Sequence, residues 1–348
     1  MLDIAQKIGD LPDFGQVLHV GSLPIVGRVF LAPMSGITDV TFRRIARRFG
    51  AAMVVSEMVA CDDYAQGERE AVLRAQGQGV APHVVQLAGC SPHWMGQAAR
   101  LAEQSGAALI DINMGCPAKR VTGGYAGSAL MRDLGVARAL IEATVQAVRV
   151  PVSVKMRLGW DHDSLNAAEL AHIAEDLGVA MVSVHGRTRQ QFYKGSADWT
   201  AIRAVRDAVR IPVVANGDCR SLDDCHAMLR QSGADAIMVG RAALGQPWLV
   251  GGLSRALARA EPVQIPSRPT RMAAAIEHLQ GLCSDFGALA GLRHARKHLN
   301  AYASMAGAPE ALRLALVTTE DVSRAIAGLR EIFGMEPVHT HEHEVEFA

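Results

Sequence analysis

Aromatic residues are scarce in this chain, since Phe, Trp and Tyr together make up only 5% of 348 residues. Hydrophobic residues nevertheless account for 49% and charged residues for 20%, which argues against intrinsic disorder. Small apolar residues must therefore fill the core, as suits helices packed tightly on a parallel sheet. The length exceeds one ordinary domain but accommodates an α/β barrel, about 250 residues, with an appendage.

The chain also lacks a net charge, long apolar runs and paired cysteine motifs. Its 35 basic and 35 acidic residues cancel, so RNA binding would depend on local basic patches. No apolar run reaches the roughly 20 residues of a membrane helix, and the first residues carry acids and glycine where a signal peptide needs an apolar stretch. None of the six cysteines has the C-x-x-C spacing of a zinc or redox site. We expect a cytoplasmic protein with free thiols, no bound metal and no membrane contact.

Eight short apolar runs alternate with helical patterns along most of the chain. The expected strands lie at 29–34, 51–58, 83–89, 108–116, 150–159, 179–187, 211–218 and 235–244. Their nearly continuous apolar character is typical of strands covered on both faces. Eight such units predict an α/β fold, the (β/α)8 TIM barrel. A doubly wound open sheet is the competing fold, disfavoured because no G-x-G-x-x-G follows any strand.

The segments flanking the strand pattern predict further parts. Residues 16–29 resemble a hairpin that closes the N-terminal end of the barrel. The later chain is purely helical, with Pro309 opening a third helix at its first position and Thr318 and Asp321 forming a capping box before a fourth. The expected organisation is a catalytic barrel domain at 1–257, a Pro-rich linker at 258–268, a small helical bundle at 269–335 and a disordered tail at 336–348.

Polar residues stand where the expected strands end. Barrel enzymes place catalytic residues at the C-terminal ends of strands, and polar groups on apolar strands are costly to bury unless paired. These positions therefore indicate one shared polar ligand in the barrel mouth. In strand order they are Met34, Ser56 and Glu57, Gln86, Asn113 and Cys116, Lys155 and Arg157, His185 and Arg187, Asn216 to Asp218, and Gly240 with Arg241.

The last two strand ends have the pattern of a phosphate site. Barrel loops after strands seven and eight often hold a phosphate, and the glycines of 216–218 and 239–244 let backbone N–H groups approach one. Arg241 could bind phosphate oxygens through two nitrogens. The alternative is that these glycines only make tight turns.

Cys116 lies beyond a strand end, before a glycine-rich polar stretch that resembles a mobile lid. A thiol is mostly protonated at neutral pH and can donate a proton, whereas the alternative is a buried, inert side chain. Lys155 could form a Schiff base, stabilise an anion or pair with a carboxylate. His185 could be a general acid, a general base or a hydrogen-bonded core residue.

Taken together, these segments resemble the tRNA-dihydrouridine synthase family, most closely its bacterial B branch. The likeness spans about residues 28–335 and departs at 121–127, where the family carries more basic residues. DINMGCPAKRV is highly specific, whereas the APM and NGD pieces fit several flavin barrels. The matching stretches are LAPMSGITD, SEM, VQLAG, DINMGCPAKRV, GSAL, VKMRLGW, VHGRTR, VANGD, GADAIMVGRAALGQPW and RHARKHLNAY.

The resemblance implies FMN as cofactor, NADPH (or NADH) as reductant and a uridine of the tRNA D-loop as substrate, with position 17 weakly favoured. It makes Cys116 the proton donor to uracil C5 after hydride reaches C6. Asn113 and Arg157 would hold the flipped base. The implied flavin contacts are Ala32, Pro33 and Met34 under the ring, Gln86 and Lys155 at its polar edge with His185 nearby, and Asn216, Gly217, Asp218, Gly240 and Arg241 at the phosphate.

Two basic patches are the favoured RNA contacts, with the first helix as a weaker third. Lys119 and Arg120 lie on the expected lid, and Arg293, Arg296 and Lys297 cluster in the helical bundle. The alternative for each patch is a solvated face, the commoner fate of a run of charges. Three other functions stay open: an FMN barrel acting on a free pyrimidine, a non-enzymatic RNA-binding regulator, and a flavin-free barrel with a phosphorylated substrate. No obligate protein partner is implied. The residues of the first-helix patch are Arg43, Arg44, Arg47 and Arg48.

Overall fold

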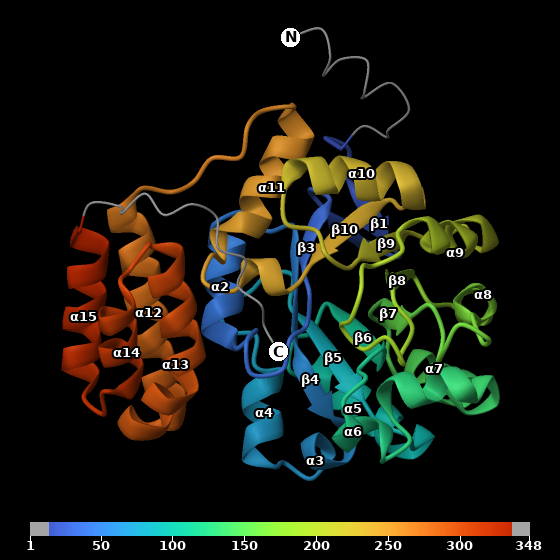
Figure 1. Cartoon of the computed structure of the whole chain (residues 1–348). Coiled ribbons are helices and arrows are strands. Elements are labelled where there is room, and N and C mark those ends of the chain that lie inside the picture. The colour runs from blue at the N-terminus through green and yellow to red at the C-terminus, as the bar shows by residue number, and fades with distance from the viewer. Residues whose placement is uncertain (1–13, 336–348) are drawn as a thin grey trace, which may run out of the picture. The chain divides into compact units, whose positions relative to one another are not determined.

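The computed structural model describes residues 14–335 (Figure 1). Eight parallel strands close into a barrel in the order β10-β3-β4-β5-β6-β7-β8-β9, which confirms the predicted TIM barrel. The disordered tail expected at 336–348 lies outside the described residues. The barrel strands are β3 (Val29–Leu31), β4 (Met53–Ala60), β5 (Val84–Ala88), β6 (Leu109–Met114), β7 (Val152–Arg157), β8 (Met181–His185), β9 (Val213–Asn216) and β10 (Ala236–Val239).

A hairpin precedes the barrel, as the sequence predicts. Its strands β1 (Leu18–Val20) and β2 (Leu23–Ile25) pair antiparallel. Leu18, Val20 and Ile25 belong to one buried apolar cluster with residues that begin barrel strands, among them Leu109 and Met181. The hairpin therefore packs against the N-terminal end of the barrel, leaving the opposite end for polar side chains.

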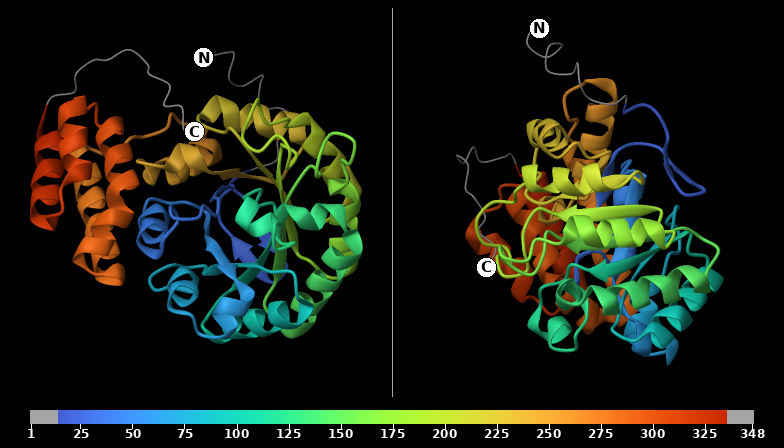
Figure 2. Two further views of the ribbon diagram at one scale, coloured as in Figure 1. Left: turned by 60° about the horizontal axis from the view of Figure 1, so that its bottom comes forward. Right: turned by 90° about the vertical axis from the view of Figure 1, so that its right-hand side faces the viewer.

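Helices run around the outside of the strands (Figure 2). Asp39 caps α2 by accepting from the N–H groups of Thr41 and Phe42, and Asp133 caps α7 through Val136. Two short helices after β4, α3 and α4, were not anticipated. No helix among the described residues is long and apolar enough to cross a membrane. The helices are α2 (Val40–Arg48), α3 (Cys61–Ala65), α4 (Arg69–Ala75), α5 (Pro92–Gln104), α6 (Lys119–Thr122), α7 (Leu134–Ala147), α8 (Ala167–Asp176), α9 (Arg203–Ala208), α10 (Leu222–Ser232) and α11 (Trp248–Arg259), with short 3-10 turns η1 (Gly127–Arg132), η2 (Thr200–Ile202) and η3 (Arg241–Ala243).

The chain divides into two compact units. One takes the residues up to Ala242 with Leu249–Gln264, and the other takes Ala243–Trp248 with the residues from Ile265 onward. The second unit is a bundle whose α12 and α13 approach closely, since a Cβ built on Gly291 would lie 2.4 Å from the Leu282 carbonyl oxygen. Its helices are α12 (Arg268–Phe286), α13 (Ala288–Met305), α14 (Glu310–Thr318) and α15 (Val322–Gly334).

Two details of the predicted helix ends in the bundle are wrong. Pro309 is the N-cap residue of α14 and does not occupy its first helical position. Asp321 alone caps α15, accepting from the backbone N–H groups of Ser323 and Arg324. Thr318 belongs instead to α14, where its hydroxyl donates to the carbonyl of Leu314. Its side chain therefore satisfies the end of one helix and cannot begin a capping box for the next.

Candidate active site

The ends of β3 and β10 bring three predicted residues together. The Ala32 N–H donates to the Val239 carbonyl at 2.9 Å, which continues the pairing of the two strands past β3. A Cβ built on Gly240 would lie 3.8 Å from both the Ala32 Cβ and the Met34 Sδ. Ala32 is buried, and Pro33 and Met34 are half-buried. The stretch 32–34 therefore faces Gly240 at one side of the barrel mouth.

A chain of hydrogen-bonded, buried side chains links the neighbouring strands β7, β6 and β5. The Ser153 hydroxyl donates to one Asp111 oxygen at 2.6 Å, and the Gln86 amide donates to the other at 2.7 Å. Asn113 then donates through its own amide to the Gln86 carbonyl oxygen at 2.7 Å. Because a carboxylate only accepts hydrogen bonds, Asp111 fixes which way both amides point.

The same chain ends on the backbone of Cys116. The Asn113 side-chain oxygen accepts from the N–H groups of Cys116 at 3.0 Å and Gly115 at 3.2 Å. On the other side, the Cys116 carbonyl accepts from the Ser128 N–H at 3.0 Å and hydroxyl at 2.8 Å. The half-buried Cys116 thus stands on a loop held at both its N–H and its C=O.

Asp111 is a site residue that the sequence reasoning missed. Burial raises the pKa of its carboxyl from 3.8 to about 6, against the hydrogen bonds from Ser153 and Gln86 and the charge of Lys155, which lower it. The available signal was its spacing from Asn113, because residues two apart on a strand share a face. Gln86 was expected to hydrogen-bond the polar edge of a flavin. Its amide is instead fully buried, and both its nitrogen and its oxygen are hydrogen-bonded within the protein.

Lys155 and Asn216 meet across β7 and β9. The Lys155 ammonium donates to the Asn216 side-chain oxygen at 3.1 Å, and the Asn216 amide donates to the Met238 carbonyl at 2.8 Å. Burial first, and then the charge of Arg157, lower the pKa of Lys155 to about 8, while Asp111 opposes this shift. The amine is therefore mostly protonated at neutral pH, and it loses its proton as the pH rises through about 8.

His185 is a neutral imidazole at this site. Burial first, then the charges of Arg157, Lys155, Arg187 and Arg241, lower its pKa well below the usual range. The Arg187 guanidinium lies 3.2 Å from the His185 Nε2, and since a guanidinium only donates, Nε2 is the acceptor. Of the alternatives left open by the sequence, the geometry disfavours a cationic general acid and leaves a hydrogen-bonding role.

The loop after β9 differs in one respect from the predicted phosphate site. The Asp218 carboxylate accepts from two Arg187 nitrogens, at 3.1 and 2.6 Å, and from the Ala197 N–H at 2.8 Å. Arg241 lies 3.6 Å from the same carboxylate. The Asp218 side chain therefore neutralises buried Arg187 and would repel a phosphate, so only the backbone of Asp218 suits the predicted role.

Gly217 needs the absence of a side chain. Its φ is +122°, a region that other residues rarely adopt. A Cβ there would also lie 2.7 Å from the Ala197 Cβ and 3.1 Å from the His185 ring. This glycine brings the backbone of the loop close against the imidazole.

Arg157 has a different position from the one that a contact with uracil requires. It is 1% exposed, its Nε donates to the Gly115 carbonyl at 2.8 Å, and its Nη1 donates to the carbonyls of Thr188 and Phe192, both at 2.8 Å. These bonds tie the loops after β6 and β8 together. The predicted base contact cannot rest on these two nitrogens, and the residue acts first as a brace for the Cys116 loop.

The expected lid contains two short helical turns. Residues 119 and 120 begin α6, which puts the backbone of Lys119 and Arg120 directly after the Cys116 loop, and Lys119 is exposed. The chain then enters η1. The lid is thus anchored at its far end, where Ser128 bonds to Cys116.

The basic patch of the bundle lies on α13. Arg293 and Lys297 are exposed, and Arg296 is half-buried. Arg293 lies 3.6 Å from Glu320, an exposed pair that water screens strongly. Lys297 and Arg293 therefore remain available to an anionic partner of this unit.

The weaker alternative, a patch on the first helix, fails for two of its four arginines. Arg43 is fully buried, and it donates to the carbonyls of Thr38 at 2.9 Å and Gln76 at 2.7 Å. Arg47 donates to the Ala52 carbonyl at 2.8 Å. The sequence offered an RNA contact or a solvated face for these arginines, but the guanidinium groups of Arg43 and Arg47 instead satisfy backbone carbonyls of neighbouring loops.

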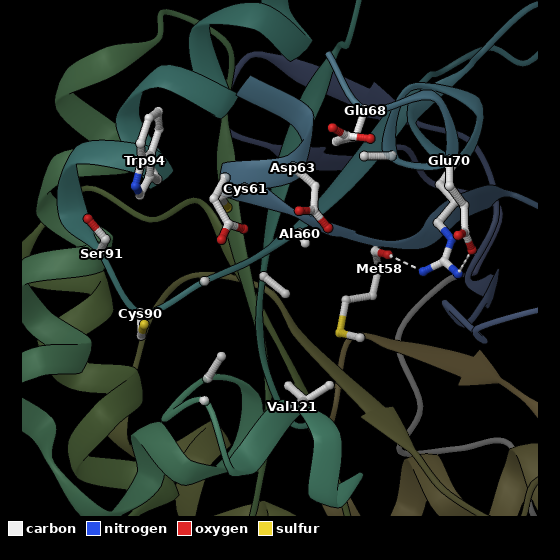
Figure 3. Close-up of a pocket in the computed structure, with 17 residues that line it drawn as sticks. Met58, Ala60, Cys61, Asp63, Glu68, Glu70, Cys90, Ser91, Trp94 and Val121 are labelled. Carbon is white, nitrogen blue, oxygen red and sulfur yellow. Dashed lines mark hydrogen bonds and ion pairs between the residues drawn. The ribbon is translucent and has the colours of Figure 1, made fainter. Parts of the chain in front are cut away.

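A cavity of about 550 Å³ lies beside the mouth, at the ends of β4 and β5 (Figure 3). None of the residues predicted to form the site lines it. Asp62, Asp63, Glu68 and Glu70 stand around it, and its positive group, Arg74, is paired with Glu70. Carboxylates repel phosphate, so this cavity is unsuited to the phosphorylated ligand that the two glycine loops indicate.

Comparison with known proteins places this geometry in context. The model of the dihydrouridine synthase (Dus) family matches residues 30–333. The chain is 51% identical over 280 residues to a probable tRNA-dihydrouridine synthase of Rhizobium leguminosarum bv. phaseoli, covering 80% of this chain and 86% of that protein. It is 46% identical over 287 residues to tRNA-dihydrouridine synthase B of Xanthomonas axonopodis pv. citri (strain 306), covering 82% and 86%.

Solved structures share the fold at low sequence identity. A 2-naphthoyl-CoA reductase complex superposes with a TM-score of 0.55 at 12% identity, covering 72% of this chain and 52% of that one. An old yellow enzyme homologue from Zymomonas mobilis superposes with a TM-score of 0.52 at 16% identity, covering 75% and 96%. At these identities the likeness concerns the barrel alone.

Proposed function

The chain belongs to the dihydrouridine synthase family, whose members are FMN-dependent oxidoreductases, and from this premise we propose that it reduces a uridine of tRNA to dihydrouridine. The observation that carries the proposal is the position of Cys116. Its loop is fixed by Asn113 at the mouth of the barrel, where Lys155 and the glycine loops also converge. The relatives named tRNA-dihydrouridine synthase support tRNA as the substrate.

The residues at the mouth fit a flavin mononucleotide. Lys155 offers an ammonium, a donor that suits the oxygen-rich pyrimidine edge of the ring, and the Asn216 side-chain oxygen holds that ammonium in place. Gly217 has no room for a side chain, and the partly exposed guanidinium of Arg241 stands beside the second glycine loop, as a phosphate cradle requires. Ala32, Pro33 and Met34 would support the ring, while Gln86 and His185 would border it, and Asn216, Gly217, the Asp218 backbone, Gly240 and Arg241 would hold its tail.

The protein's own groups carry the rest of the proposed reaction. When bound, FMN supplies the hydride, drawn from NADPH, that adds to uracil C6. Cys116 gives its thiol proton to C5, so that one hydride and one proton saturate the C5–C6 bond. Lys155 would place positive charge beside the pyrimidine edge of the bound ring. Asn113 holds the Cys116 loop in place and, with Arg157 behind it, borders the space for the base.

We further propose that the substrate uridine lies in the D-loop, with position 17 favoured by the likeness to the B branch. A base must leave its stack to reach this mouth, which costs a few kcal/mol. Lys119 and Arg120 beside the loop, and Arg293, Arg296 and Lys297 on α13, would supply the compensating phosphate contacts.

The experiment is incubation of the purified, flavin-loaded protein with unmodified tRNA and NADPH, followed by mapping of dihydrouridine along the molecule. Dihydrouridine in the D-loop of tRNA, and none in free uridine, is the expected result. Reduction of free uridine or uracil at a comparable rate would instead identify an enzyme for a free pyrimidine. Protein that stays colourless with added FMN would contradict the flavin assignment.

A further inference from the structure

Three loops at the barrel mouth meet in a stack of two arginines on one tryptophan. The guanidinium carbon of Arg132 lies 4.9 Å from the ring centroid of Trp160, and that of Arg189 lies 4.7 Å from it. Arg132 ends η1, Trp160 follows β7 and Arg189 follows β8. Because β6, β7 and β8 are neighbours in the barrel, the stack lies on the same rim as Cys116.

Neither guanidinium is neutralised within the described residues. Arg132 is exposed and has no carboxylate partner there. Arg189 is half-buried, and its Nε is enclosed without a hydrogen-bond acceptor. The Asp161 carboxylate forms no ion pair with either arginine among the described residues, and it accepts instead from Ser164 at 2.6 Å and from Gln190 at 3.4 Å. The rim thus keeps two positive charges for a group from outside the chain.

The distances make this arrangement an electrostatic site. Both guanidinium carbons lie within 5 Å of one centroid, so they are at most about 10 Å apart, close to one Debye length at physiological ionic strength. Their mutual repulsion is therefore only partly screened, and an anion between or beside them relieves it. Contact with the ring holds both guanidinium groups in place, and their terminal N–H groups can bond to oxygens of an anion.

We propose that Arg132 and Arg189, stacked on Trp160, form a phosphate-binding site for the RNA strand next to the uridine presented to Cys116. The inference rests on the proposed function and extends it to residues with no role so far. The turn that ends in Arg132 begins against the Cys116 loop through Ser128. A phosphate bound there belongs to a nucleotide flanking the target base, and two separated cations suit the successive phosphates of a strand.

The test measures binding of full-length unmodified tRNA by the flavin-loaded protein at several salt concentrations. Arg132→Gln and Arg189→Gln are compared with Arg149→Gln, an exposed arginine just before β7 at the opposite end of the barrel. Each rim variant should weaken binding by roughly 10-fold and reduce the slope of log affinity against log salt by about 1. Arg132→Lys, which keeps the charge, should retain the slope. The control variant should leave both quantities unchanged.

Steady-state kinetics show whether the bound phosphate belongs to tRNA or to NADPH. The KM for tRNA should rise in the rim variants, while kcat and the KM for NADPH stay as in the wild type. A rise in the KM for NADPH alone, or an unchanged salt slope, would overturn the assignment to RNA. Because the binding titration needs no turnover, a wild type that binds tRNA in this way but forms no dihydrouridine would refute the proposed reaction and leave this site standing.

Discussion

The buried carboxyl of Asp111 makes a quantitative prediction about stability. Its pKa is raised from 3.8 to about 6 by burial, so the folded protein retains a proton that the unfolded chain releases between these values. Stability from this group is therefore fully present below about pH 4 and is lost as the pH rises through about 6. The complete difference corresponds to about 3 kcal/mol of unfolding free energy.

Asp111→Asn removes the titration and preserves the shape. The unfolding free energy of the wild type minus that of the variant should fall by about 2 kcal/mol between pH 4.5 and 7.5, the part of the range above the unfolded value. Urea unfolding at a series of pH values measures this difference. The comparison uses the transition of the barrel, because the chain has two units and need not unfold in one step.

A second variant should increase the pH dependence of the unfolding free energy, whereas Asp111→Asn should remove it. The Ser153 hydroxyl lowers the pKa of Asp111, so Ser153→Ala should raise that pKa further and enlarge the pH dependence. A difference between wild type and Asp111→Asn that does not change with pH would refute the reasoning. So would a Ser153→Ala variant with a smaller dependence than the wild type.

Three further predictions follow from individual residues. The rate of dihydrouridine formation should fall as the pH rises through about 8, where Lys155 loses its proton, and the pH profile of kcat/KM measures this limb. Gly217→Ala should purify with little flavin, because its φ is +122° and a Cβ has no space, whereas Gly334→Ala, with nothing within 4 Å, should keep its flavin. Gly291→Ala should destabilise the bundle by about 2 kcal/mol or more in thermal unfolding, because its Cβ would meet the Leu282 carbonyl.

The sequence predicts the barrel well for a physical reason. Strands covered on both faces are largely apolar, so all eight could be located, and the polar residues at most of their ends mark the mouth. The hairpin and the helical bundle also follow from local patterns. By contrast, α3 and α4 are short helices that come soon after the long strand β4. They have too few residues to show the hydrophobic periodicity by which a helix is predicted.

The pairing of side chains is what the sequence does not contain. Arg157 and Asp218 stand at strand ends as predicted, yet both are bonded mainly within the protein, to carbonyls and to Arg187. Arg43 belongs to a helix with many basic residues, but its side chain is buried and donates a hydrogen bond to a backbone carbonyl. These hydrogen bonds join segments that lie far apart in the sequence, and so do the bonds made by Asp111. Neither residue spacing nor composition predicts such pairings.

The role of Cys116 as proton donor is the central claim, and single-turnover reduction of unmodified tRNA by pre-reduced enzyme tests it most directly. Cys116→Ala should bind flavin and accept electrons from NADPH as the wild type does, yet form dihydrouridine at least 100-fold more slowly, as expected for the loss of a general acid. Cys283→Ala, a half-buried thiol on α12 of the helical bundle, should react at the wild-type rate. A Cys116→Ala enzyme that reduces tRNA as fast as the wild type would contradict the account.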